Sequence, residues 1–132
     1  MSHLPLAVLE TLQRLLAPAR APVTLAQYRA LRAVADGAER VFELQRALGV
    51  GVATASEVSR RLADLGLLEK HPDLRDKRCT RLRLTAKGSQ VRRAYEEAIG
   101  KAWSKRLAGL SHPLRVMEAL QSLAELLGEV RT

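Results

Sequence analysis

The chain of 132 residues holds a single cysteine, Cys79, so it cannot form an internal disulfide bond. It also has no apolar run close to the roughly 20 residues that a helix needs to cross a bilayer. The N-terminal segment MSHLPLAVLE has no basic lead before its apolar residues, so a secretory signal is not indicated. Together these absences favour a protein of the reducing cytoplasm that has no membrane partner.

Patterns typical of catalysis and metal binding are missing as well. The sequence has no Ser/His/Asp spacing, no glycine-rich phosphate loop, and no clustered acid pair with a reason for shifted pKa values. The three histidines are dispersed, and even if His71 and Cys79 met across a hairpin, two ligands would not make a zinc site. We therefore expect neither an enzyme nor a bound metal or cofactor.

Negative charge is under-represented. Lys and Arg number 22 against 14 Asp and Glu, which gives a net charge of +8. This balance suggests a polyanion such as nucleic acid as the first partner to test; a membrane surface comes second and is not the partner that we expect. The length and the hydrophobic content of 47% are ordinary for one domain with a packed core.

Apolar residues at helical spacing predict that most of the chain is helical. Pro5 opens a first helix that ends before Pro18. Thr24 and Gln27 have the spacing of a capping box, which opens a second helix that ends at Gly37. The predicted buried side of this second helix consists of Leu25, Tyr28, Leu31 and Ala35.

A helix-turn-helix is predicted next. A short helix over 39–48 is followed by a turn at Gly49 and by an amphipathic helix over 52–65. At 100° per residue, the apolar side of this fourth helix consists of Ala55, Val58, Leu62 and Leu65. The opposite side consists of Ala53, Ser56, Glu57, Arg60 and Asp64. The second helix of such a pair enters the major groove of DNA.

A β-hairpin is predicted directly after this helix. Residues 67–71 and 79–84 form its strands, the second with the alternation of a half-buried strand, and 72–78 form a charged turn. A hairpin in this place is a wing. Thr85 then caps a long fifth helix, in which Gly100 is an expected interruption.

Four stretches resemble one known family, the MarR-type winged-helix transcription regulators. The most specific feature is a D-x-R-D-x-R turn followed by L-T-x-K-G. The sequence departs from the family at Gly51, where Ser or Thr is frequent, and at Glu57, where a basic residue is frequent. The four stretches are LAQYRALRAV at 25–34, ELQRALGV at 43–50, RRLADLGLLEKHPDLRDKR at 60–78 and LRLTAKG at 82–88.

The resemblance implies a mostly α (α+β) fold in a single winged-helix domain, 1–132. The winged helix-turn-helix module at 25–85 would bind DNA, with the fourth helix in the major groove and the wing in the neighbouring minor groove. Helices at 4–17 and 86–128 of two chains would interlock into a homodimer. Apolar stripes agree with this, because a monomer would leave them partly exposed. The expected dimerisation residues are Leu9, Leu12, Leu16, Leu120, Leu123 and Leu127.

The strongest local charge lies in the wing and just after it. From Arg75 to Arg93, eight basic residues stand against Asp76 alone, a balance of +7. Narrow A·T-rich minor grooves attract arginine, and the resemblance makes Arg78 and Lys77 the best candidates for insertion. Asp76 would support the wing by bracing Arg78 or Arg75. The expected DNA-binding residues are Thr54, Ser56, Glu57, Arg60, Arg61, Arg75, Lys77 and Arg78.

Glu57 is open to two interpretations. Its carboxylate would repel phosphate, but it could accept a hydrogen bond from cytosine N4 or pair with Arg61 one turn further on. We favour the helical pair. Ser56 and Arg60 lie on the polar side and can serve either base edges or phosphates.

Regulation has few candidate residues. We expect Tyr28 and Phe42 to pack in the core. In the family that the chain resembles, the fifth helix lines a cleft for small effectors, so Tyr95 and Trp103 are weak effector candidates, although packing is favoured for both. Nearby arginines favour a small aromatic or apolar anion. A redox role of Cys79 is not favoured, because oxidant-sensing members usually carry their cysteine in the first helix.

The leading hypothesis is a sequence-specific double-stranded DNA-binding transcriptional regulator. It would be a homodimer that represses from a pseudo-palindromic operator until an effector changes the spacing of its recognition helices. Two alternatives stay open: a winged-helix module for protein contacts, and a non-specific architectural DNA-binding protein. A steep salt dependence of duplex binding argues against the first, and a preferred sequence argues against the second.

Overall fold

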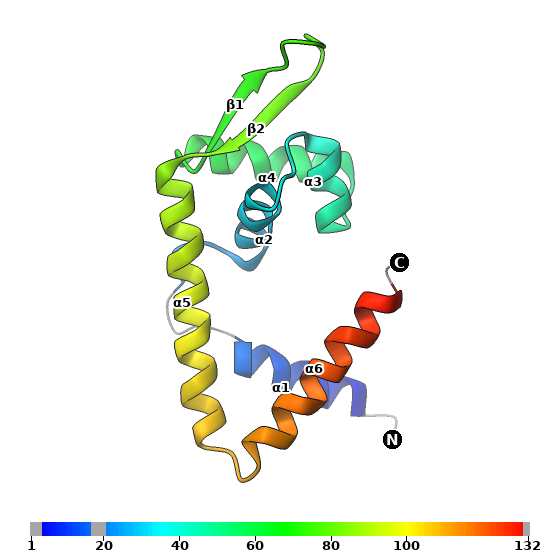
Figure 1. Cartoon of the computed structure of the whole chain (residues 1–132), viewed down its shortest axis with the longest axis vertical. Helices are drawn as coiled ribbons and strands as arrows, with labels where there is room; N and C mark the ends of the chain where they lie inside the picture. Colours follow the sequence, from blue (N-terminus) through cyan, green and yellow to red (C-terminus); the bar gives the residue numbers. More distant parts are fainter. Residues whose placement is uncertain (1–3, 17–20, 131–132) are drawn as a thin grey trace. The chain divides into compact units, whose positions relative to one another are not determined.

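The computed structural model describes residues 4–16 and 21–130 (Figure 1). Within these ranges the elements are α1 (Leu4–Leu16), α2 (Leu25–Ala35), α3 (Val41–Leu48), α4 (Val52–Asp64), β1 (Leu68–Pro72), β2 (Thr80–Leu84), α5 (Ala86–Ala108) and α6 (Pro113–Val130). This mostly helical architecture with one small antiparallel sheet confirms the predicted fold class. The chain forms two compact units. One contains α1, the end of α5 from Ile99, and α6, and the other spans Ala19–Ala98.

The unit Ala19–Ala98 is built around one apolar core. Helices α2, α3 and α4 pack against one another and against the hairpin of β1 and β2. Leu31 of α2, Leu44 of α3 and Leu62 of α4 are fully buried in this core, and Leu82 of β2 is buried beside them. Burying an aliphatic side chain of this size contributes about 1.5–3 kcal/mol relative to exposure. The core therefore holds the helix-turn-helix and the hairpin together.

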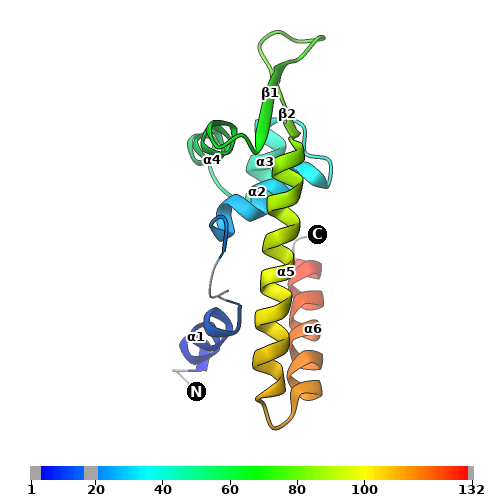
Figure 2. The same ribbon diagram turned by 90° about the vertical axis from the view of Figure 1, so that its left-hand side faces the viewer.

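The hairpin projects beyond the three helices in both views (Figure 1, Figure 2). Its strands pair antiparallel, from Leu68 opposite Leu84 to Pro72 opposite Thr80. Leu68 and Leu82 are buried, whereas Pro72 and Thr80 at the outer end are exposed. The base of the hairpin is thus anchored in the core, and its turn is presented to solvent.

The capping box at the start of α2 is confirmed, but the predicted buried side of this helix is right only for Leu31 and, in part, Tyr28, and is wrong for Leu25 and Ala35. The Thr24 hydroxyl accepts a hydrogen bond from the Gln27 N–H at 3.1 Å, and the Gln27 side chain accepts one from the Thr24 N–H at 3.0 Å. Leu31 and Val34 are buried, whereas Leu25 is 61% exposed. The buried side of α2 is the side on which α3, α4 and β2 pack. The helical repeat of α2 alone does not identify that side.

Helix α3 begins at Val41, two residues later than the sequence predicted. Arg40 is extended, with φ −129° and ψ 157°, and forms an isolated β-bridge with Arg81. The Glu39 carbonyl accepts a 2.6 Å hydrogen bond from the N–H of Leu82. The segment before α3 therefore pairs with β2, a long-range contact that helical periodicity does not predict.

Helix α5 runs without a break from Ala86 to Ala108, so the interruption expected at Gly100 is wrong. A single glycine in a helix costs only about 0.5–1 kcal/mol relative to alanine, which a helix of 23 residues can accommodate. Helix α6 likewise continues past Gly128 to Val130.

Candidate nucleic-acid interface

Helix α4 is the second helix of a helix-turn-helix, and glycine makes the turn before it. Gly49 caps α3 in the left-handed region with φ 67°, where a side chain would be strained. Its N–H bonds back to the carbonyl of Gln45 at 3.0 Å, and the next N–H, of Val50, bonds to the same carbonyl at 3.2 Å. The chain reverses there and α4 starts after Gly51.

The solvent-facing side of α4 carries all the residues predicted on this helix to bind DNA. The side that faces the core is formed by Ala55, Ser59 and Leu62. The buried Ser59 hydroxyl is satisfied because it donates to the Ser56 carbonyl at 2.9 Å. Leu65, expected on the apolar side, is instead the C-cap and is largely exposed. The exposed predicted residues are Thr54, Ser56, Glu57, Arg60 and Arg61.

Ion pairs cover the exposed side of α4. Arg60 donates to both carboxylate oxygens of Glu57, at 2.7 Å from Nη2 and 3.1 Å from Nε, and its Nη1 donates to Asp64 at 3.2 Å. The Glu57–Arg61 pair favoured from the sequence is present as well, with Nε and Oε1 3.4 Å apart. Hydrogen bonding from Arg60 lowers the pKa of Glu57, and the same pair raises the pKa of Arg60.

The wing turn presents its basic residues to solvent. The side chain of Arg78 is 95% exposed, and Arg75 and Lys77 are exposed beside it. Leu74 in the same turn is 99% exposed. In the described part of the chain, Arg75 and Lys77 have no ion-pair partner, so their charge is available to an outside anion.

Asp76 lies next to Arg78, where the sequence placed a wing support. Its Oδ1 accepts the backbone N–H of Arg78 at 3.1 Å and lies 3.6 Å from the Arg78 Nε. Its Oδ2 accepts a weak hydrogen bond from the Cys79 thiol at 3.6 Å. These contacts close the turn locally.

A second carboxylate, Asp73, is the first residue of the D-x-R-D-x-R turn and lies deeper in the wing, and no role was predicted for it from the sequence. It is only 2% exposed, and its Oδ2 accepts a 2.7 Å hydrogen bond from Nη2 of Arg40. Arg81 approaches the same oxygen at 3.7 Å, and the backbone N–H of Arg75 donates to Oδ1 at 2.9 Å. The Arg75 N–H, followed by Arg40 and Arg81, lowers the pKa of Asp73. The contact with the Arg75 N–H is local to the turn, whereas Arg40 and Arg81 lie outside it, so no local pattern signals their contacts with Asp73.

The L-T-x-K-G motif joins the start of α5 to the end of α4. The Thr85 hydroxyl donates to the Gly66 carbonyl at 2.7 Å, and the Lys87 ammonium donates to the Leu65 carbonyl at 3.3 Å. A Cβ on Gly88 would collide with the Leu67 carbonyl oxygen, so the backbones approach as closely as only glycine allows. The motif therefore fixes the position of the start of α5 relative to the end of α4.

The aromatic residues divide between packing and exposure. Tyr28 stacks on Tyr95 with ring centroids 4.4 Å apart, and the Tyr28 hydroxyl donates to Glu96 at 3.0 Å. Burial and then Glu96 raise the pKa of Tyr28. Tyr95 is 4% exposed, whereas Trp103 is half-buried. Phe42 is largely exposed, so its predicted core position is wrong.

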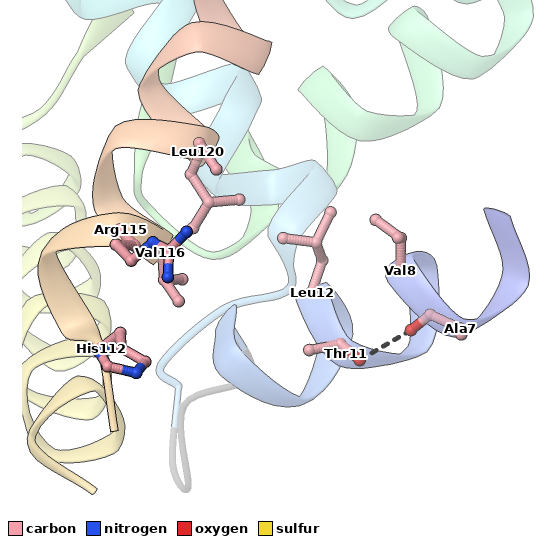
Figure 3. Close-up of a pocket in the computed structure, with 9 residues that line it drawn as sticks. Ala7, Val8, Thr11, Leu12, His112, Arg115, Val116 and Leu120 are labelled. Atoms are coloured by element: carbon pink, nitrogen blue, oxygen red, sulfur yellow. Dashed lines mark hydrogen bonds between the residues drawn. The ribbon is translucent and has the colours of Figure 1, made fainter. Parts of the chain in front are cut away.

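The other unit has an open apolar groove of about 550 Å³ between α1 and α6 (Figure 3). Leu12 and Leu120, both predicted for dimerisation, line it, and His112 and Arg115 supply its polar part. The side chain of Leu16 lies outside the described part of the structure. The remaining predicted dimerisation residues are exposed: Leu9, Leu123 and Leu127.

The ligands considered for a metal have separate partners. His71 lies 3.0 Å from Glu69, and Cys79 contacts Asp76. Among the residues that the structure describes, no three His, Cys, Asp or Glu side chains cluster as a metal site would require. Within the same ranges, no helix is both long and apolar enough to span a membrane.

A helix-turn-helix followed by a basic hairpin defines the winged-helix class. The model of the MarR family matches residues 23–80 of this chain. The winged-helix module is therefore similar to the MarR family of transcription regulators, the family whose resemblance was seen in the sequence. No curated protein sequence matches the chain significantly.

Solved structures extend the similarity to the whole fold. The PcaV transcriptional regulator from Streptomyces coelicolor is 25% identical, with 98% of each chain covered and a TM-score of 0.74. Its complex with its natural ligand gives 26% identity, 99% and 93% coverage, and a TM-score of 0.72. MarR from E. coli is 22% identical, with 98% and 96% coverage and a TM-score of 0.69. BpsR from Bordetella bronchiseptica, whose DNA binding is regulated by 6-hydroxynicotinic acid, is 23% identical, with 98% and 99% coverage and a TM-score of 0.69.

Proposed function

We propose that this protein is a cytoplasmic, sequence-specific DNA-binding transcriptional regulator without catalytic activity. The observation that carries the proposal is the joint exposure, in one compact unit, of the polar side of α4 and of the basic wing turn. Helix α4 is the element that would enter the major groove, and Arg78 is the side chain that would reach the minor groove. Thr54, Ser56, Glu57, Arg60 and Arg61 from α4 and Arg75, Lys77 and Arg78 from the wing form the proposed DNA surface.

The network around Asp73 supports a role of the wing in binding. A hairpin that carried charge only for solubility would need no buried acid to fix its turn. Here Asp73 ties the turn to Arg40 before α3 and to Arg81 in β2. The wing is therefore held in a defined place relative to the helix-turn-helix, as simultaneous contacts to two neighbouring grooves require.

The proposal is tested by selecting duplexes from a random-sequence pool and measuring the affinity for them over a range of salt. We expect an inverted-repeat sequence and a slope of log K against log salt near −0.9 for each phosphate that is neutralised. Binding without sequence preference would instead indicate an architectural protein. Undetectable duplex binding at low salt would overturn the proposal and favour the protein-contact module.

We infer further that the protein acts as a homodimer on a pseudo-palindromic operator. Support comes from α1 and α6, whose leucines Leu9, Leu123 and Leu127 are exposed beside the apolar groove. A second copy is the partner that would cover leucines on both helices, and its two recognition helices would sit on half-sites about 34 Å apart.

Release by a small aromatic or anionic effector is the final part of the proposal. It is supported by PcaV, which was solved with its natural ligand, and by BpsR, whose DNA binding responds to 6-hydroxynicotinic acid. Tyr95 has little surface free for a ligand because it is stacked on Tyr28, so Trp103 is the better of the two candidates. The test is to titrate salicylate against the free protein and against its DNA complex. A ligand that weakens DNA binding tenfold must itself bind the complex tenfold more weakly, and equal affinities would exclude this ligand class.

A further inference from the structure

The recognition helix is electrically balanced, although the whole chain carries a net charge of +8. Its charged residues are Arg60, Arg61, Glu57 and Asp64, and all four are exposed. Attraction to phosphate is the sequence-independent part of DNA affinity. Helix α4 contributes little to this attraction while its acids stay paired with its arginines, whereas Arg75 and Lys77 of the wing are unpaired.

The ion pairs leave a particular part of Arg60 free. A guanidinium has five N–H donors, and Arg60 uses three of them within the helix: Nε and one on Nη2 for Glu57, and one on Nη1 for Asp64. One N–H remains on each of Nη1 and Nη2. An arginine reads a guanine in the major groove with two N–H groups, which donate to O6 and N7, and Arg60 keeps two N–H groups for this purpose.

We propose that Glu57 is a positioning residue for base recognition, which holds the guanidinium of Arg60 so that its two free N–H groups read a guanine. With Asp64 it fixes the side chain before DNA arrives, which reduces the rotamer entropy lost on binding. The same carboxylate competes with phosphate for Arg60 and repels the DNA backbone. This inference rests on the proposed sequence-specific DNA binding.

Glu57 thus has opposite effects on two kinds of binding. It weakens attachment to any duplex, because it neutralises an arginine that would otherwise contact phosphate. It strengthens the preference for guanine, because it keeps the guanidinium of Arg60 oriented so that its free N–H groups can donate to the base. A residue that merely stabilised α4 would change both affinities in the same direction.

The test compares Glu57→Gln with the unmodified protein on three duplexes. They are the most enriched duplex from the random pool, the same duplex with its half-site guanines replaced by adenine, and a mixed-sequence duplex. We expect Glu57→Gln to bind the mixed duplex more tightly, with a salt slope steeper by about 0.9. The guanine preference, about 5- to 150-fold for a good bidentate contact, should fall towards that of Arg60→Ala.

Asp36→Asn is the matched control, since it also removes one exposed carboxylate that pairs with an arginine one turn away, Arg32 at 3.8 Å. Asp36 lies at the end of α2. Asp36→Asn should therefore change the guanine preference and the salt slope less than Glu57→Gln does. In an Arg60→Ala background, Glu57→Gln should have no further effect on guanine preference, because its action passes through Arg60.

The outcomes separate this inference from the proposed function. If the unmodified protein selects a preferred sequence but Glu57→Gln keeps its guanine preference and its salt slope, the positioning role is wrong and the regulator stands. The positioning role is equally wrong, and the regulator again stands, if Arg60→Ala leaves the preference for every guanine of the selected sequence unchanged. If no sequence is preferred at all, both conclusions fail together.

Discussion

The guanidinium of Arg40 donates a 2.7 Å hydrogen bond to the carboxylate of Asp73, which is almost fully buried in the wing. Arg40 lies just before α3 and Asp73 just after β1, so this contact ties the helix-turn-helix to the hairpin. Arg81 completes the arrangement, as it also approaches Glu39 at 3.3 Å. Two parts of the proposed DNA surface thus depend on one carboxylate that does not itself face solvent.

Asp73→Asn should lower the stability of the fold and the affinity for DNA at neutral pH. The pKa of Asp73 is lowered in the folded state, so its ionised form stabilises the protein above the pKa that it has when unfolded. That contribution is lost as the pH falls through the folded pKa, below about pH 4. Denaturant unfolding should therefore show a difference in the free energy of unfolding between the two proteins at pH 7, and this difference should become smaller as the pH is lowered. A difference in the free energy of unfolding that does not change with pH would contradict the claim that the ionised carboxylate of Asp73 stabilises the fold.

Arg78→Ala should reduce the salt dependence of duplex binding by about one unit of slope if the side chain contacts phosphate. If it enters the minor groove, the preference for flanking A·T pairs should weaken instead. Lys105→Ala provides the control, because it removes one exposed positive charge from the other unit. An Arg78→Ala protein that matches the Lys105→Ala protein in slope and in sequence preference would remove Arg78 from the interface.

Leu123→Asp should convert a dimer into monomers at micromolar concentration, as measured by analytical ultracentrifugation. A charge at this exposed position on α6 would be buried without a partner if two copies meet there. Leu74→Asp makes the same chemical change at a fully exposed leucine of the wing and should leave the oligomeric state unchanged. A monomeric unmodified protein would refute the dimer.

Two alanine substitutions in α5 should shift stability in opposite directions. Gly88→Ala places a Cβ against the Leu67 carbonyl and should destabilise the protein by about 1–3 kcal/mol. Gly100→Ala meets no atom within 4 Å and should stabilise the helix by about 0.5–1 kcal/mol. Thermal unfolding of both variants tests the prediction, and equal melting temperatures would show that the close approach at Gly88 is unimportant.

The candidate interface was largely readable from the sequence where its signals are local. Ser56, Glu57 and Arg60 were placed on the solvent side of α4 by a 100° repeat, and their exposure follows it. The basic wing turn was predicted from charge that is contiguous in the chain. The stronger partner of Glu57 was missed, because residues three and four apart are both within reach and only side-chain geometry distinguishes Arg60 from Arg61.

The sequence by itself determined the order of the elements, the capping box at Thr24 and the turn at Gly49, because caps and helical repeats connect residues within about four positions. Tertiary structure alone decided which side of α2 is buried, the stacking of Tyr28 on Tyr95, and the burial of Asp73 between Arg40 and Arg81. Each of these joins segments that are distant in the chain. Their pairing is set by how the core closes around Leu31, Leu44 and Leu62, and no local pattern records it.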